Sequence, residues 1–210
     1  MHPDRPAPEL VRLAVLISGG GTTLDNLVAR IGDGRLRGVQ IRLVISSRSN
    51  VRGVEIARAA GLPLAVIRRR DYPSDEAFSV ALTAALDRAG VDLVVLAGFL
   101  CFWQVPPRYQ GRVLNIHPAL LPRFGGKGFY GHRVHEAVLA AGATESGCTV
   151  HLVDNEYDHG PIVGQSRVPV RPDDTPESLA ERVGAAEREL YPRVIQEVAD
   201  RGLKWLGQFR

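Results

Sequence analysis

The segment Leu13-Ala14-Val15-Leu16-Ile17-Ser18-Gly19-Gly20-Gly21-Thr22-Thr23 gives the clearest indication of the fold. It begins with a continuous apolar run, a pattern typical of a strand that is buried on both faces of a parallel sheet. Glycines and threonines follow, and we expect a helix from about Leu24. A buried strand that passes through a glycine-rich turn into a helix is the first half of a βαβ unit.

The glycine-rich turn also predicts a binding site for an anion. Glycine lets the backbone approach a ligand closely, and the first N–H groups of a helix face outward at the positive end of the helix dipole. The turn from residue 19 to residue 23 is therefore predicted to cradle a phosphate group. It lacks the lysine of a P-loop, and Leu24 stands where a G-x-G-x-x-G motif would have its third glycine. A tight turn that binds nothing remains the alternative.

Strands and helices continue to alternate through the first half of the chain. The apolar runs predict strands over residues 41–45, 64–67 and 91–97, and helices over residues 51–60 and from Ser74 to about residue 88. Ser74 is expected to cap its helix, and Gly61 and Gly90 to end the two helices. This order favours a single-domain α/β fold with a doubly wound parallel sheet and right-handed crossovers.

The last third of the chain predicts a helix over residues 134–141 and two strands, over residues 147–153 and 162–168, that pair antiparallel. A final helix begins with Thr175 as its cap and Pro176 at its first position. Its spacing predicts one apolar face, formed by Leu179, Val183, Ala186 and Leu190. Glu187 lies beside this face, where its side chain can point into a cleft.

The segment Asn115-Ile116-His117-Pro118-Ala119-Leu120-Leu121-Pro122 carries the strongest candidate for catalysis. It directly follows the apolar pair at residues 113 and 114, and in a strand the period of two places Asn115 and His117 on one face at the carboxyl end. Ligands bind at that end of the strands in open α/β sheets. The two prolines preclude a helix and hold the chain in a stiff turn. A purely structural or capping role for the Asn-x-His pair is the alternative.

Three other segments are candidates for the walls of a site. Residues 98–103 follow a predicted strand and are more apolar and aromatic than a surface loop, which favours a pocket wall for a flat ligand over simple core packing. Residues 154–161 form an acidic turn whose carboxylates either do chemistry or bond their own backbone. Residues 125–131 form a glycine-rich loop with one cation, which is expected to be mobile or lid-like.

The composition is that of an ordinary soluble globular enzyme. The chain has 210 residues, of which 45% are hydrophobic and 23% charged, enough for one sizeable core. A net charge of +3 and a pI near 9.1 fit an anionic small molecule and are too small to indicate nucleic acid. The one basic triplet, residues 68–70, is followed by Asp71, which favours a solvated loop over contact with an anionic substrate tail.

The remaining features concern location and boundaries. Cys101 and Cys148 have no CxxC spacing, so neither a disulfide framework nor a zinc site is indicated, and a reducing cytoplasm fits. Residues 1–12 are charged and contain prolines, so they are interpreted as an N-terminal extension and not as a signal peptide; residues 13–210 form the domain. No apolar run is long enough to span a bilayer, and we expect no membrane or nucleic-acid partner.

Taken together, these motifs make the sequence similar to the phosphoribosylglycinamide formyltransferase family over nearly its whole length. The resemblance rests on residues 17–22, 96–99, 115–122 and 158–161, which stand at the right separations. It implies a mostly parallel, Rossmann-like sheet of about seven strands with helices on both faces. It also implies transfer of a formyl group from 10-formyltetrahydrofolate, the co-substrate, to the amine of N1-(5-phospho-D-ribosyl)glycinamide in purine (IMP) biosynthesis, without a metal.

The resemblance assigns roles to individual residues. Catalysis is carried over to Asn115, His117 and Asp158; binding of the substrate phosphate to Gly21, Thr22 and Thr23; contact with the glycinamide and ribose end to Glu187; and folate binding to Leu100, Cys101, Phe102, Trp103, Asn115, Asp154 and Asp158. The sequence departs from the family where Thr23 replaces a common Asn, and where Asp75 and Cys101 replace a common Arg. The basic triplet at residues 68–70 is a candidate substitute for the contact with the folate tail.

The chemistry of formyl transfer explains why the resemblance needs these three catalytic groups. An uncharged amine attacks the formyl carbon and produces a tetrahedral oxyanion, so the site requires hydrogen-bond donors and a route for one proton. Asn115 can donate without titrating, and His117 can donate or shuttle the proton because its ordinary pKa of about 6.5 is near neutral pH. We expect the neighbouring carboxylate of Asp158 to raise the pKa of His117.

Two other interpretations stay open. A formyltetrahydrofolate hydrolase, or the catalytic half of methionyl-tRNA formyltransferase, resembles the chain around the same three residues, but each is expected to need an additional domain. A non-enzymatic module that senses a phosphate or a nucleotide would use only the turn at residues 19–23 and would leave Asn115, His117 and Asp158 without a role. The sequence is compatible with either a monomer or a homodimer.

Overall fold

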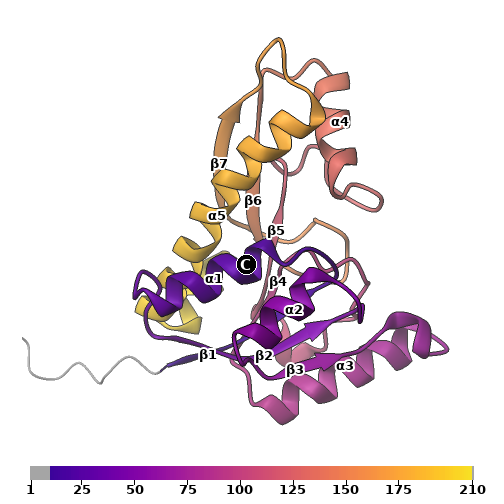
Figure 1. Ribbon diagram of the computed structural model, residues 1–210, viewed down its shortest axis with the longest axis vertical. Helices are drawn as coiled ribbons and strands as arrows, with labels where there is room; N and C mark the ends of the chain where they lie inside the picture. The colour runs from indigo at the N-terminus through magenta and orange to yellow at the C-terminus, as the bar shows by residue number, and fades with distance from the viewer. Residues whose placement is uncertain (1–9, 210) are drawn as a thin grey trace, which may run out of the picture.

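The computed structural model describes residues 10–209 and contains one sheet of seven strands (Figure 1). The strands are β1 (Val11–Ile17), β2 (Val39–Ser46), β3 (Leu64–Val66), β4 (Leu93–Leu96), β5 (Val113–His117), β6 (Glu145–Leu152) and β7 (Ile162–Pro169). The α-helices are α1 (Thr22–Gly32), α2 (Arg52–Ala59), α3 (Asp75–Ala89), α4 (His132–Ala140) and α5 (Pro176–Arg201). Short 3₁₀ helices are η1 (Arg69–Asp71), η2 (Pro107–Tyr109) and η3 (Leu203–Phe209).

The strand order is β3-β2-β1-β4-β5-β6-β7. Strands β1 to β5 pair in parallel, whereas β6 is antiparallel to β5 and β7 is antiparallel to β6. The predicted mostly parallel α/β sheet is therefore confirmed. The order reverses between β1 and β4, and the loops after these two strands diverge, which opens a crevice at their carboxyl ends.

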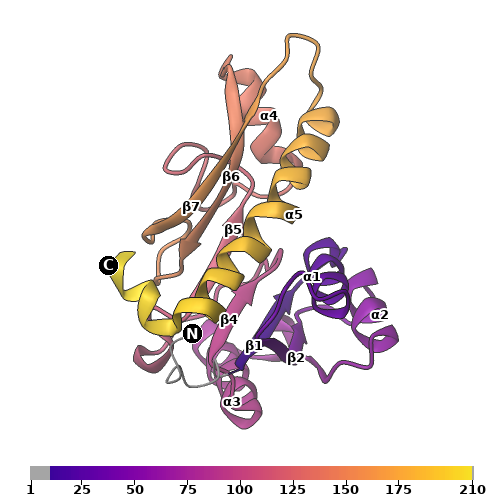
Figure 2. The same cartoon turned by 90° about the vertical axis from the view of Figure 1, so that its left-hand side faces the viewer.

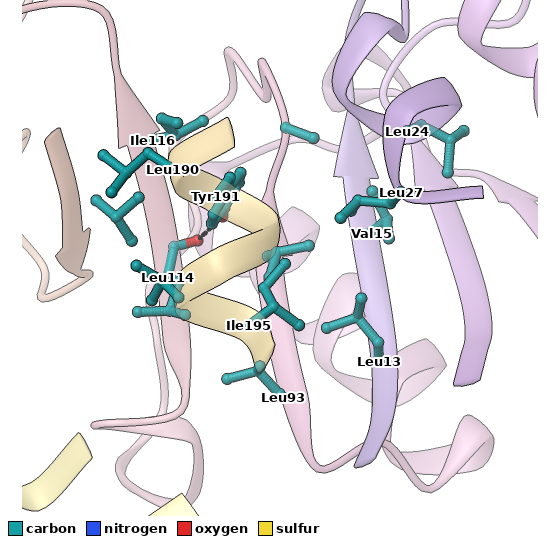
Figure 3. Close-up of a cluster of buried hydrophobic side chains, with 14 of the residues drawn as sticks. Leu13, Val15, Leu24, Leu27, Leu93, Leu114, Ile116, Leu190, Tyr191 and Ile195 are labelled. Atoms are coloured by element: carbon teal, nitrogen blue, oxygen red, sulfur yellow. Dashed lines mark hydrogen bonds between the residues drawn. The ribbon is translucent and has the colours of Figure 1, made fainter. Parts of the chain in front are cut away.

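Helices cover both faces of the sheet, as expected. One hydrophobic cluster combines side chains of α1, α4 and α5 with one face, and a second cluster combines α3 with the other face. The long helix α5 lies diagonally across β4 and β5 (Figure 2). The fully buried Tyr191 fixes it there, because its hydroxyl donates to the carbonyl of Leu114 at 2.9 Å and lies 3.2 Å from that of Leu96 (Figure 3). This anchor places the preceding turn of α5 beside the carboxyl ends of the strands.

The ends of α3 and α5 have the capping residues that were predicted from the sequence. Ser74 accepts a hydrogen bond from the N–H of Ala77 at 3.2 Å, and Gly90 ends α3 in the left-handed region with φ 61°. Thr175 caps α5 in a capping box. Helix α1 begins at Thr22, two residues before the predicted start, because Gly21 adopts φ 73° and lets the helix begin directly after the turn.

Two segments differ from, or extend, the expectations. The basic triplet is not a plain loop: Arg69 lies in η1 and forms an ion pair with Asp75, while Arg68 pairs with Asp71 at 2.6 Å. Strand β1 starts at Val11, and residues 1–9 of the expected extension lie outside the described residues. Over residues 10–209, no helix has the length and apolar character needed to cross a membrane.

Candidate active site

All the predicted site residues line one cavity. Its volume is about 390 Å³, within the range of small-molecule sites. It lies at the carboxyl ends of β1, β4 and β5, and its wall includes Gly21, Thr22, Thr23, Leu100, Cys101, Phe102, Trp103, Asn115, His117, Asp154, Asp158 and Glu187. Segments that are far apart in the sequence therefore meet at the crevice predicted from the strand order.

The glycine-rich turn is built by close backbone packing. A Cβ on Gly21 would lie 2.5 Å from the Cα of Gly53, the second residue of α2, and the N–H of Gly53 donates to the carbonyl of Gly19 at 3.1 Å. With φ 73°, Gly21 also has a conformation that other residues rarely adopt. No side chain caps the first turn of α1, so its N–H groups remain available to a ligand in the cavity.

Asn115, His117 and Asp158 lie together, as predicted. The two carboxylate oxygens of Asp158 divide between the other two residues: Oδ1 is 3.4 Å from Nδ2 of Asn115, and Oδ2 is 3.4 Å from Nδ1 of His117. The N–H of Gly126 also donates to Oδ2 at 3.0 Å. Asp158 has φ 54°, a conformation that is uncommon for a side-chain-bearing residue and that aims the carboxylate at β5.

The hydrogen bond of His117 defines which ring nitrogen carries a proton. Nε2 lies 2.8 Å from the carbonyl oxygen of Phe124, which can only accept, so Nε2 is protonated. In the neutral ring Nδ1 therefore has a lone pair that faces Asp158. Protonation of Nδ1 would convert this contact into an ion pair.

The expected rise in the pKa of His117 is wrong. The side chain is only 3% exposed, and burial lowers the pKa of His117 below its ordinary value despite the opposing effects of the Asp158 carboxylate and the Phe124 carbonyl. The charge of His151 lowers it further. At rest His117 is therefore a neutral base next to a carboxylate, and not the imidazolium that the sequence suggested.

Asp158 itself is held in the charged form. Burial acts to raise the pKa of this carboxyl, but the hydrogen bond with His151, the charge of His117 and the N–H of Gly126 together bring it below its usual value. A Cβ on Gly125 would meet Cδ2 of Leu121 and would lie 3.2 Å from the Cβ of Asp158, so a larger residue there would crowd both side chains. The glycine-rich loop thus packs directly against Asp158.

His151 is a fourth polar group that the sequence reasoning missed. It is 2% exposed, its Nδ1 donates to the carbonyl of Leu152 at 2.9 Å, and its Nε2 lies 3.0 Å from Nδ2 of Asn115 and 3.6 Å from Oδ1 of Asp158. The antiparallel register of β5 and β6 places it directly opposite Asn115. The available signal in the sequence was a polar residue in the alternating strand over residues 147–153. The sequence did not show the register in which this strand pairs with β5.

The residues of the predicted pocket wall at 98–103 differ in their exposure to the cavity. Leu100 is 48% exposed, and Phe102 packs against Tyr157 of the acidic turn with ring centroids 5.6 Å apart. Trp103, in contrast, is mainly a core residue, because it is 4% exposed and its indole N–H donates to Thr83 at 3.0 Å. A flat ligand would therefore meet the first part of the segment more than its end.

The acidic turn is tied to the neighbouring loop and to itself. The side-chain oxygen of Asn155 accepts from the N–H of Val105 at 2.8 Å, which joins the two walls of the cavity. Asp154 accepts from the N–H of Glu156 at 2.8 Å and contacts His159 at 2.9 Å. Asp154 thus stabilises its own turn, which was the structural alternative for these carboxylates, while Asp158 faces the other catalytic candidates.

Glu187 and His135 are the other titratable groups of the cavity. Burial raises the pKa of Glu187 to about 7, with Arg188 opposing the shift, so this carboxyl is poised to titrate near neutral pH. His135 on α4, which the sequence analysis also missed, is 4% exposed, and burial lowers its pKa to about 4. Its Nδ1 is buried without a hydrogen-bond partner among the described residues.

These features define a class of protein: a doubly wound α/β enzyme whose cavity combines an anion-binding turn with an amide, an imidazole and a carboxylate for proton transfer and oxyanion stabilisation. In residues 10–209, no group of three or more His, Cys, Asp or Glu side chains is arranged to hold a metal ion. The profile of the formyl transferase family matches residues 11–195. The chain belongs to the formyl transferase family.

Similar proteins agree with this membership. A chloroplastic phosphoribosylglycinamide formyltransferase of Arabidopsis thaliana is 42% identical over 201 residues, which cover 94% of this chain and 68% of that protein. The trifunctional purine biosynthetic protein adenosine-3 of Homo sapiens is 39% identical over 199 residues, which cover 94% of this chain but only 19% of that protein.

Solved structures of similar proteins share the fold. Glycinamide ribonucleotide transformylase 1 from Symbiobacterium toebii matches with a TM-score of 0.86 and 37% identity, covering 96% of this chain and 94% of that one. The phosphoribosylglycinamide formyltransferase from Coxiella burnetii matches with a TM-score of 0.84 and 39% identity, covering 92% and 89%. The fold predicted from the sequence is therefore confirmed by solved relatives as well.

Proposed function

We propose that the protein transfers the formyl group of 10-formyltetrahydrofolate to the amine of N1-(5-phospho-D-ribosyl)glycinamide, a step of purine biosynthesis. The observation that carries this proposal is one cavity, which is lined both by the turn at residues 19–23 and by the group Asn115, His117 and Asp158. If the turn binds a phosphate while an amine reacts beside Asn115, His117 and Asp158, the substrate must carry both a phosphate and an amine. The names of the similar proteins support the same substrate.

The substrate binds along the cavity in two parts. The N–H groups at the start of α1, with Gly21, Thr22 and Thr23, hold the phosphate, because they offer donors at the positive end of a helix dipole. Glu187 faces the glycinamide and ribose end, where its carboxylate accepts hydrogen bonds. Since its pKa is about 7, Glu187 is a stronger acceptor above neutral pH than below it.

The formyl-folate occupies the aromatic side of the same cavity. Leu100, Cys101 and Phe102 form one wall and the turn that contains Asp154 and Asp158 forms the other, joined by the hydrogen bond from Val105 to Asn155. Pterin rings are flat and carry donors and acceptors at their edges, so an apolar slot with a polar rim fits them.

Catalysis combines oxyanion stabilisation with proton transfer. When the amine attacks the formyl carbon, the amine loses one proton, the leaving nitrogen of the folate gains one, and the carbonyl oxygen becomes an oxyanion. Asn115 donates to that oxygen: its 3.4 Å contact with Asp158 is long for a hydrogen bond, so the substrate replaces it at little cost. Each such donor supplies roughly 3 kcal/mol.

His117 and Asp158 handle the proton. Neutral His117 accepts it at Nδ1, since Nε2 already bears a proton directed at Phe124. The resulting imidazolium is stabilised by the charged carboxylate of Asp158 at 3.4 Å, which offsets part of the cost of burying the charge. The proton then passes to the leaving nitrogen of the folate. The oxyanion collapses, the bond between that nitrogen and the formyl carbon breaks, and the imidazole ring returns to its neutral form.

One assay with three acceptors tests the proposal. Purified protein and 10-formyltetrahydrofolate are combined with phosphoribosylglycinamide, with methionyl-tRNA or with water alone, and release of tetrahydrofolate is followed. We expect fast release only with phosphoribosylglycinamide, because the phosphate anchor supplies the binding energy that orients the amine. Release at the same rate without an acceptor would support a hydrolase instead.

We also propose a cytoplasmic location and a monomer or homodimer, neither with a nucleic-acid or membrane partner. The reduced cysteines support the location, because Cys101 and Cys148 are not bonded to each other. Sedimentation of the purified protein over a range of concentrations tests the oligomeric state, and fractionation of cells tests the location.

A further inference from the structure

The phosphate turn has no cation of its own, although its ligand would carry close to two negative charges at neutral pH. Its residues, from Gly19 to Thr23, offer only backbone N–H groups and two hydroxyls. Nearby, helix α5 contains a glycine in its interior, Gly184, where a helix ordinarily disfavours one. The guanidinium of Arg188 occupies the space that this glycine leaves, with Nη1 3.5 Å from the position of a Cβ on Gly184.

Helices α1 and α5 advance in the same direction where they meet. Asn26 donates to the carbonyl of Arg188 at 2.8 Å, and Arg30 forms an ion pair with Glu189. Further along, in the segment that follows α1, the N–H of Arg37 donates to Gln196 at 2.8 Å. One turn before Asn26 is Thr22, the first residue of α1. One turn before Arg188 is Gly184, so the guanidinium folded over Gly184 is displaced toward the level of Thr22.

Arg188 is solvent-exposed and follows directly in the chain a residue that lines the cavity. Glu187, its neighbour in the chain, lines the same cavity as Thr22, and the charge of Arg188 acts on it by lowering its pKa. Within residues 10–209, the guanidinium of Arg188 has no hydrogen bond and no ion pair, whereas Arg30 on the same helix contact is paired with Glu189.

We propose that Arg188 is the cation of the phosphate site, and that Gly184 provides the room for its guanidinium; the identity of the phosphate-bearing substrate rests on the proposed function. Arg188 donates to the phosphate oxygens that the N–H groups of α1 leave open, because a guanidinium binds two phosphate oxygens at once. The site is then built from two helices, with the backbone of one and a side chain of the other.

Binding measured by calorimetry tests this role directly. In Arg188→Gln, the dissociation constant of phosphoribosylglycinamide should rise roughly 10- to 100-fold, the range for a lost hydrogen bond to a charged group. The dissociation constant of dephosphorylated ribosylglycinamide should stay within about twofold, because that ligand lacks the group that Arg188 binds. Arg188→Lys should retain part of the affinity as a point charge without the paired donors.

A second variant and two controls keep the test independent of folding. Gly184→Leu fills the space over which the guanidinium lies, improves helix propensity, and should weaken phosphate binding in the same direction. Arg201→Gln removes the same charge from an exposed site near the end of α5 and should leave binding unchanged. Arg52→Gln, at the start of α2 beside Gly53, tests the rival cation next to the turn.

Inorganic phosphate separates this inference from the proposed function. It should bind in the turn of the wild-type protein and more weakly in Arg188→Gln, whatever the protein formylates. Equal losses for the phosphorylated and the dephosphorylated ligand would mean that Arg188 acts through Glu187 and would overturn the proposal. So would unchanged phosphate affinity in Arg188→Gln, or a loss confined to Arg52→Gln.

Discussion

The two ends of the cavity are built in different ways. The end proposed to bind phosphate, called the phosphate end below, is made of backbone: glycines in close contact and the open N–H groups of α1. The end proposed to carry catalysis, called the catalytic end, is made of buried side chains, whose hydrogen bonds and charges depend on one another. Backbone donors do not titrate, whereas the hydrogen bonds of the catalytic end change with the protonation of His117 and Asp158.

The difference also decides how each end can fail. At the catalytic end, removal of one side chain leaves its partners buried and without a hydrogen bond, which is costly in itself. At the phosphate end most donors are backbone N–H groups, so apart from the proposed loss of Arg188, damage is expected from an added side chain in the turn. Substitutions at the two ends should therefore separate into losses of turnover and losses of substrate affinity.

The largest effect is expected from His117→Ala. The variant lacks the imidazole proposed to accept the proton, so kcat should fall roughly 10²-fold or more. The dissociation constant of phosphoribosylglycinamide should change little, since the phosphate end is intact. Single-turnover kinetics and calorimetry measure the two quantities; near-normal turnover by a folded variant would remove His117 from the mechanism.

A comparable but pH-dependent effect is expected from Asp158→Asn. The amide can no longer stabilise the imidazolium, so the pKa of His117, already lowered by burial, falls further. The pH profile of kcat should move to lower pH and its maximum should drop roughly 10-fold or more. An unchanged profile would show that Asp158 only shapes its turn.

Gly21→Ala should instead damage the phosphate end. The Cβ would lie 2.5 Å from the backbone of Gly53, and the residue would have to keep φ 73°, so α2 and the turn must move apart. We expect affinity for phosphoribosylglycinamide to fall roughly 10-fold, equivalent to about 1.4 kcal/mol, with folate affinity unchanged. Gly32→Ala, at the far end of α1, is the matched control, because a Cβ there meets no atom within 4 Å. Equal losses for both ligands would indicate a folding defect.

The same contrast explains what the sequence could predict. The glycine-rich turn, the caps at Ser74 and Thr175 and the strand carrying Asn115 and His117 are local features, and the structure has each of them, although α1 begins two residues earlier than predicted. The mostly parallel sheet followed from the alternation of strands and helices. The conformation of each of these elements is determined by a few neighbouring residues, so it could be predicted without knowing the contacts between distant segments.

What the sequence could not predict depends on contacts between distant segments. His151 joins the catalytic group only because β6 pairs with β5 in one particular register. Trp103 belongs to a core that Thr83 and Tyr109 complete from elsewhere in the chain. The pKa of His117 is lowered because burial outweighs the opposing effect of the Asp158 carboxylate. Burial is a property of the whole fold, whereas the motif indicates only the carboxylate.

The smallest effect concerns stability and involves His135, at the edge of the same cavity. Its folded-state pKa of about 4 lies below the ordinary value of 6.5, so the unfolded chain binds a proton in this range that the folded protein does not. The contribution of neutral His135 to stability is therefore complete above pH 6.5 and is lost as the pH falls toward 4. Between pH 7.5 and pH 5.5 the loss amounts to about 1 kcal/mol.

His135→Leu isolates this contribution. Leucine is similar in size, does not titrate and replaces a buried Nδ1 that has no partner among the described residues, so the variant should lose about 1 kcal/mol less than wild type between pH 7.5 and pH 5.5. Urea unfolding at the two pH values gives the difference. If His135→Leu kept the wild-type difference in stability between the two pH values, the proton would be taken up at another group of the folded protein.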